Sequence, residues 1–144
     1  MKHFRMDEFL RSATARKLGI ANRPSRQEEH NIEALVANVL DPLREAVGVP
    51  ITVTSGYRCP LLNRAIGGAA TSQHTKGEAA DITAMKRRNT AQLFHIIRER
   101  LPFDQLIWEN GDDEAPAWVH VSYKAGANRG EVLRFKNGRY ERMA

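Results

Sequence analysis

Length, composition and charge describe one ordinary globular domain. The chain has 144 residues, of which 42% are hydrophobic and 27% charged, and no run approaches the ~20 apolar residues of a membrane span. Its single cysteine, Cys59, excludes an internal disulfide framework. We therefore expect residues 1–144 to form a single domain that does not insert into a membrane.

The net charge of +5 favours an anionic partner but does not identify one. The short run Lys86–Arg88 falls in a predicted loop and is most simply a solvated basic surface. The sequence has no basic-aromatic or groove-reading motif, so nucleic acid is the weaker alternative and we expect no nucleic-acid partner. A cell-wall polymer that carries carboxylates or phosphates would also suit the charge.

Two helices are predicted in the first third of the chain. Residues 7–18 have the apolar spacing of a short helix. Ser25 and Glu28 then have the spacing of a capping box, which opens a long amphipathic helix that reaches Val47. Pro42 removes a backbone donor from this helix and predicts a kink.

The middle of the chain alternates strands with short helices and loops. The β-branched run 51–54 predicts a strand that places Arg58 just beyond its end. A short helix is expected over 60–66, and the Gly-Gly pair that follows opens a flexible loop. Residues 79–84 have the pattern of a second strand.

The last third of the chain adds one helix and several strands. A helix is expected over 90–100, with Asn89 as its cap. Strands follow over 103–109 and 117–123, and the segment 131–143 predicts a hairpin with an Asn-Gly turn of type I′. Helices first, then strands mixed with helices, indicate an α+β fold with a mainly antiparallel sheet and flanking helices.

Three residues are potential metal ligands. His74 and Asp81 lie seven positions apart, and His120 lies on the last strand before the predicted hairpin. Imidazole and carboxylate are ligands that zinc accepts, and three of them leave the fourth tetrahedral position open for water. We predict that the three bind one zinc ion. The remaining histidines, His3, His30 and His95, are expected in structural or surface positions.

The residues around these ligands carry a family resemblance. Ser72–Asp81 and the later His120 resemble the signature S-x-H-x-x-G-x-A-x-D…H of the M15 zinc peptidases, the D-alanyl-D-alanine carboxypeptidase-like family that includes phage peptidoglycan endopeptidases. The similarity continues upstream through Phe4, 12–15, 22–25, 40–44 and the turn 55–58. The resemblance implies the fold that these peptidases share with the hedgehog signalling domain, and a zinc-dependent peptidase that hydrolyses peptide bonds in bacterial peptidoglycan.

The resemblance also implies catalytic residues, with one departure. Arg58 would stabilise an oxyanion or bind a terminal carboxylate, the alternative being a salt bridge that only holds the turn. Many relatives carry the catalytic carboxylate three residues before the last histidine, where this chain has Ala117. Glu109 is the best substitute as general base, because its strand is expected to pair with the strand of His120. A surface glutamate, with a base from the acidic turn 112–114, is the alternative.

Four further residues are expected to support the ligands or contact substrate, namely Ser72, Gln73, Tyr57 and Trp118. Cys59 raises a rival chemistry, a cysteine nucleophile paired with His74 or His120, although a lone cysteine is more often a small buried hydrophobe. A second class of function is a non-catalytic zinc-binding module of the same fold that binds cell-wall peptides. The missing carboxylate at Ala117 favours that module.

The expected substrate and setting follow from the resemblance alone. A carboxypeptidase that trims a terminal D-Ala and an endopeptidase that cuts a stem or crosslink fit equally well. The segment 1–8 lacks the apolar core of a signal peptide, so we expect synthesis in the cytoplasm without an export signal. The protein would act on the wall after release or as part of a phage particle, as a monomer.

Overall fold

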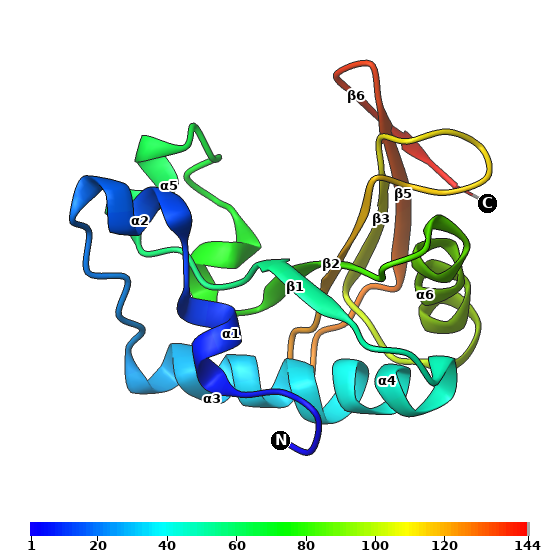
Figure 1. Cartoon of the computed structure of the whole chain (residues 1–144), viewed down its shortest axis with the longest axis horizontal. Helices are drawn as coiled ribbons and strands as arrows, with labels where there is room; N and C mark the ends of the chain where they lie inside the picture. The colour runs from blue at the N-terminus through cyan, green and yellow to red at the C-terminus, as the bar shows by residue number, and fades with distance from the viewer. Residues whose placement is uncertain (144) are drawn as a thin grey trace.

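Residues 1–143 are described by a computed structural model, in which a six-stranded sheet is flanked by helices (Figure 1). The helices are α1 (Met6–Leu10), α2 (Ala13–Leu18), α3 (Arg26–Leu35), the π-helix η1 (Val36–Leu40), α4 (Asp41–Val47), α5 (Pro60–Ala65), the 3-10 helix η2 (Gln73–Lys76) and α6 (Arg87–Arg100). The strands are β1 (Thr52–Ser55), β2 (Ala79–Thr83), β3 (Gln105–Glu109), β4 (Trp118–Ser122), β5 (Glu131–Lys136) and β6 (Arg139–Arg142). Among residues 1–143, no helix has the length and apolar character needed to cross a bilayer.

The sheet has the strand order β1-β2-β4-β3-β5-β6. Neighbouring strands are antiparallel except β3 and β5, which are parallel. The predicted α+β class with a mainly antiparallel sheet is therefore confirmed.

The strand register gives the sheet one apolar face and one polar face. Side chains that alternate along β2, β4 and β3 belong to the core, namely Ala80, Ile82, Val119, Val121, Leu106 and Trp108. Helix α6 packs against these strands and against α4, and the ring of Phe94 lies 5.1 Å from that of Trp108. Because directly opposed residues of antiparallel strands share a face, Asp81, His120 and Glu109 lie together on the other face.

The helix predicted over 7–18 is in fact two helices. The backbone is extended at Arg11 and Ser12, which separate α1 from α2. Ser12 is the N-cap of α2, and its Oγ accepts a hydrogen bond from the backbone N–H of Ala15 at 3.2 Å. A serine favours a cap over a helix interior, which explains the break in an otherwise helical pattern.

The long amphipathic helix is continuous but contains a π-helical turn. Ser25 and Glu28 form the predicted capping box at its start. A kink was predicted at Pro42; the structure has a π-helical turn just before it, where the N–H of Asp41 donates to the carbonyl of Val36. A widened turn of this kind accommodates a position that has no backbone donor.

Three predictions about the chain after β2 have different outcomes. Helix α6 begins at Arg87 with Lys86 as its N-cap, so the basic run starts a helix and is not a loop. Asn89 is not the cap, because its side-chain amide donates to Gln92 within the helix at 2.7 Å. The hairpin turn is confirmed, since Asn137 and Gly138 have φ angles of 53° and 74°, as type I′ requires.

Candidate metal centre

The three predicted ligands gather in one cluster. Potential ligand atoms of His74, Asp81 and His120 all lie within 4.8 Å of one another. His74 Nε2 is 3.3 Å, and His120 Nδ1 is 3.1 Å, from Asp81 Oδ1. Ligand atoms bound at ~2.0–2.1 Å to a tetrahedral zinc ion are separated by roughly 3.3 Å, so the donors present fit zinc. His3, His30 and His95 lie outside this cluster.

The backbone sets the positions of the ligands. Asp81 on β2 lies directly opposite His120 on β4, so the sheet register brings this pair together. His74 lies on η2, the short helix that precedes β2, and its side chain is buried. Two ligands therefore come from neighbouring strands and the third from the short helix η2.

His74 is held by the turn that carries Arg58. Its ring Nδ1 lies 2.8 Å from the carbonyl oxygen of Gly56, and the backbone N–H of Arg58 donates to the carbonyl of His74 at 3.1 Å. A carbonyl only accepts, so Nδ1 carries the proton and Nε2 presents its lone pair to Asp81. Ser72 Oγ accepts from the backbone N–H of His74 at 3.2 Å and fixes the start of η2.

The position of Gly77 in the structure shows why the motif has a glycine here. It ends η2 with a φ angle of +72°, a conformation that side chains other than glycine rarely adopt. A Cβ atom at this position would lie 2.6 Å from the backbone carbonyl oxygen of Glu28 on α3. The ligand loop therefore packs directly on the long helix.

Asp81 is ionised in this environment. Burial opposes its ionisation, but the imidazoles of His120 and His74 on either side hold the pKa of Asp81 well below its usual range. The carboxylate therefore presents a full negative charge between the two imidazoles, which is the charge state that binds a metal ion.

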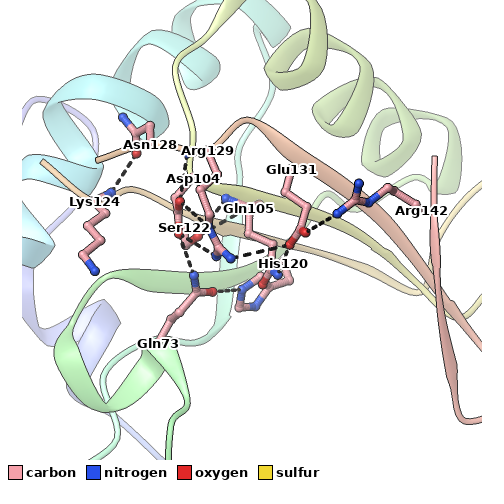
Figure 2. A network of polar contacts seen from close by, with 10 residues as sticks. All are labelled: Gln73, Asp104, Gln105, His120, Ser122, Lys124, Asn128, Arg129, Glu131 and Arg142. Atoms are coloured by element: carbon pink, nitrogen blue, oxygen red, sulfur yellow. Dashed lines mark hydrogen bonds and ion pairs between the residues drawn. The ribbon is translucent and has the colours of Figure 1, made fainter. Parts of the chain in front are cut away.

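Gln73 holds the second histidine from the far side of its ring. Gln73 Oε1 lies 2.9 Å from His120 Nε2. Figure 2 shows the two side chains beside each other. The N–H of His120 therefore lies at Nε2, and Nδ1 faces Asp81. This is the supporting position expected for Gln73 from the sequence.

Glu109 is a buried carboxylate beside the ligands. Only 9% of its surface is exposed, which contradicts the alternative of a surface glutamate. Within residues 1–143 its side chain forms no ion pair. Burial raises the pKa of Glu109 to about 7, with His120 lowering it and Asp81 raising it. Such a group exchanges a proton near neutral pH.

Arg58 is a half-buried cation that forms no ion pair with any carboxylate of residues 1–143. One of its amino groups, Nη2, donates to Ser72 Oγ at 3.3 Å, and the part of the chain that the structure describes offers it no ion pair. The alternative of a salt bridge that holds the turn is therefore wrong. Burial lowers the pKa of Arg58 and Asp81 raises it, and the guanidinium keeps its charge at neutral pH.

One cleft of about 500 Å³ connects these groups. It is lined by the metal-ligand candidates, by Arg58 and Glu109, and by Ser72, Gln73 and Trp118 from the sequence prediction. The sequence did not point to Tyr140, which also lines the cleft from β6. Tyr140 lies opposite Phe135, which in turn lies beside Glu109, so strand register places all three on the cleft face.

Several residues considered from the sequence lie outside the cleft. Tyr57 is 4% exposed and packs in the core, where its backbone N–H donates to Phe9. Cys59 is the N-cap of α5, and its Sγ accepts from Leu62. In the acidic turn, Asp112 and Asp113 form ion pairs with arginines away from the ligands. The cleft therefore contains no cysteine nucleophile among its lining residues in 1–143.

A comparison with models of protein families shows which family the chain belongs to. The model of the family Peptidase M15 matches residues 2–122, which include the three ligands, Arg58 and Glu109. No curated protein gives a significant match to the chain. M15 peptidases are zinc metallopeptidases, and the His74, Asp81 and His120 group is suited to hold their metal. The chain therefore belongs to peptidase family M15.

Proposed function

We propose that the chain is a zinc-dependent peptidase that hydrolyses peptide bonds in bacterial peptidoglycan. The observation that carries the proposal is the composition of the cleft. A site for one metal ion lines the same cavity as a carboxylate and a guanidinium that form no ion pair within residues 1–143. Hydrolysis of an amide needs an activated water, a proton acceptor and a donor for the developing oxyanion, and these groups supply all of them.

His74, Asp81 and His120 would hold the metal. Bound there, zinc supplies a Lewis acid that lowers the pKa of a coordinated water toward ~7. Asp81 contributes a single negative charge between two neutral imidazoles, so the site keeps a net positive charge when it is loaded. The three ligands line the cleft, through which substrate would reach the metal.

Glu109 serves as the general base in this proposal. Its carboxylate takes a proton from the attacking water and delivers a proton to the leaving amine. The raised pKa, about 7, suits a group that must both accept and release a proton at neutral pH. Glu109 is opposite Trp118, the residue after Ala117, so it lies beside the position that bears the carboxylate in many members of the family that this chain resembles.

Arg58 serves as the electrophilic group. A guanidinium donates two parallel hydrogen bonds and therefore suits either the carbonyl oxygen, as negative charge develops on it, or a terminal carboxylate. Ser72 orients the side chain from one side. Because no carboxylate of residues 1–143 neutralises Arg58, its charge is free to act on the substrate.

The substrate follows from the family and from the charge of the chain. A net charge of +5 suits a wall polymer that carries carboxylates. The cleft is accessible from outside, so trimming of a terminal D-Ala and cutting of a stem or crosslink both fit it. We further propose a monomer that acts on the wall, in a phage or prophage setting, with no nucleic acid as partner.

A non-catalytic zinc-binding module that binds wall peptides is the second candidate. The observation that favours it is Ala117, which replaces the carboxylate expected three residues before His120. The buried Glu109 weighs against it, because burying an unpaired carboxylate costs stability without any benefit to peptide binding alone.

The test is digestion of purified peptidoglycan by the zinc-loaded chain, with metal-stripped chain as the control. A peptidase releases new amino groups without new reducing ends, and mass spectrometry of the fragments identifies the bond. New reducing ends would indicate a glycosidase and contradict the proposal. Zinc-loaded protein that binds wall fragments but releases no amino groups across several wall preparations would favour the binding module.

A further inference from the structure

A partly buried polar chain extends from His120 on the side away from Asp81. Figure 2 shows it running from His120 through Gln73 to Asp104 and Arg129. Gln73 Nε2 donates to Asp104 Oδ2 at 3.0 Å, while Gln73 Oε1 faces His120 Nε2 at 2.9 Å. The family signature and the cleft do not account for Asp104, whose side chain is only 3% exposed.

Asp104 is held rigidly by one residue. Arg129 donates to Asp104 through its backbone N–H at 3.0 Å, through Nε at 2.9 Å and through Nη2 at 3.0 Å. These hydrogen bonds from Arg129 hold the pKa of Asp104 below its usual range. An ionised carboxylate only accepts hydrogen bonds.

The orientation of the Gln73 amide follows from this charge. The end of the amide that faces Asp104 has to be the NH₂ group, because the carboxylate offers no proton. The carbonyl end then faces His120 Nε2, and a carbonyl requires a proton on that nitrogen. A neutral imidazole carries one N–H, so its lone pair is at Nδ1, which faces Asp81.

We propose that Asp104 is a positioning residue which, through Gln73, selects the nitrogen that His120 offers to metal. The proposal rests on the metal site of the proposed function. A glutamine alone accepts either ring tautomer by turning its amide over, and the fixed carboxylate of Asp104 removes that freedom. The surface arginine Arg129 thereby influences the metal site indirectly. It fixes Asp104, which orients Gln73, which in turn orients His120.

Zinc affinity of the purified chain, measured by competition with a chelator, tests this role without any substrate. Asp104→Asn lets the amide of Gln73 adopt either orientation, and we expect zinc to bind about 10–100-fold more weakly, the usual effect of losing such a partner. Combining Gln73→Glu with Asp104→Asn restores a fixed acceptor toward His120, because the amide introduced at position 104 then donates to the carboxylate introduced at position 73. This double variant should recover most of the lost affinity.

Asp41→Asn is the matched control. Asp41 is also a buried aspartate, and its two oxygens accept from the backbone N–H groups of Lys2 and His3, far from the cleft. We expect this variant to lose stability but to keep wild-type zinc affinity. A general effect of removing a buried charge would weaken zinc in both variants and would contradict the proposal.

Gln73→Met provides a second route if Asp104→Asn fails to fold. It removes the acceptor but leaves Asp104 and Arg129 paired. In zinc-loaded, ¹⁵N-labelled protein, the proton on His120 Nε2 should exchange slowly in the wild type and rapidly in Gln73→Met, with zinc bound about 10–100-fold more weakly. If Gln73 had only a structural role, the exchange rate of the proton on His120 Nε2 would be the same in Gln73→Met as in the wild type.

The outcomes separate this inference from the proposed function. Wild-type chain that binds no zinc would contradict the metal site itself. Asp104→Asn or Gln73→Met with wild-type zinc affinity and a protected ring proton would overturn only the role of Asp104. A double variant as weak as Asp104→Asn would likewise overturn it.

Discussion

Asp81 and His120 lie directly opposite each other on β2 and β4, with Asp81 Oδ1 3.1 Å from His120 Nδ1. Antiparallel pairing in the middle of the sheet sets this spacing, and only His74 has to be brought in by a loop. Two ligands are therefore preorganised by backbone hydrogen bonds that do not depend on a metal. The core behind them should persist when a ligand is lost.

The first prediction concerns the three ligands. Replacing His74, Asp81 or His120 by Ala leaves too few donors for a stable site, so stoichiometric zinc should be lost while far-ultraviolet circular dichroism is retained. His95→Ala is the control, because this histidine lies outside the cluster. Elemental analysis that finds full zinc occupancy in any of the three variants would remove that residue from the site.

The second prediction concerns Arg58. Arg58→Ala removes the donor for the developing oxyanion, and we expect turnover to fall by about 10²–10³-fold with zinc content unchanged. Arg58→Lys should recover little, because an ammonium does not reproduce the paired donors of a guanidinium. Steady-state hydrolysis of wall peptides measures this, and wild-type turnover in Arg58→Ala would exclude the assigned role.

The third prediction concerns Gly77. Gly77→Ala places a side chain at a φ angle of +72° with its Cβ 2.6 Å from the Glu28 carbonyl, so η2 and His74 must shift and zinc affinity should fall. Gly138→Ala is matched in conformation, at φ +74°, but its Cβ meets nothing within 4 Å. Both variants should lose about 1 kcal/mol of stability from the backbone alone. Only Gly77→Ala should bind zinc more weakly, and equal zinc affinity in the two variants would contradict the packing argument.

The fourth prediction concerns the stability of metal-free protein. The pKa of Glu109 is raised from 4.5 to about 7, so the folded state holds this proton more tightly than the unfolded chain. The stability from Glu109 is complete below pH 4.5 and is lost as pH rises to about 7. Glu109→Gln does not titrate, so the wild type should lose stability relative to it over this window. Urea unfolding of metal-free samples measures the difference, and a constant difference would contradict the raised pKa.

The sequence pattern predicted most of what positions the ligands. Period-two alternation identified β2 and β4, and the signature identified His74, Asp81 and His120. The inference that Glu109 ends a strand next to that of His120 was correct, because Glu109 pairs with Trp118. These features depend on local pattern and on pairing between strands close in the chain.

The features that the sequence did not reveal depend on distant pairing. β5 lies parallel to β3, and this register brings Tyr140 to the cleft and Arg129 to Asp104. No local pattern specifies that β5 pairs with β3. The position of Tyr140 and the contact between Arg129 and Asp104 could therefore not be predicted from the sequence. At Ser12 a local preference was overlooked instead. The apolar spacing predicted one continuous helix, but Ser12 favours a helix cap and divides it into two.

The most direct test of the account is Glu109→Gln, which keeps the size of the side chain but cannot accept a proton. We expect purified Glu109→Gln to retain one zinc ion per chain, while release of amino groups from peptidoglycan falls by about 10²–10⁴-fold. The acidic limb of the wild-type pH–rate profile should also disappear in the variant. Hydrolysis close to the wild-type rate, with zinc bound, would show that Glu109 is not the base and would contradict the account.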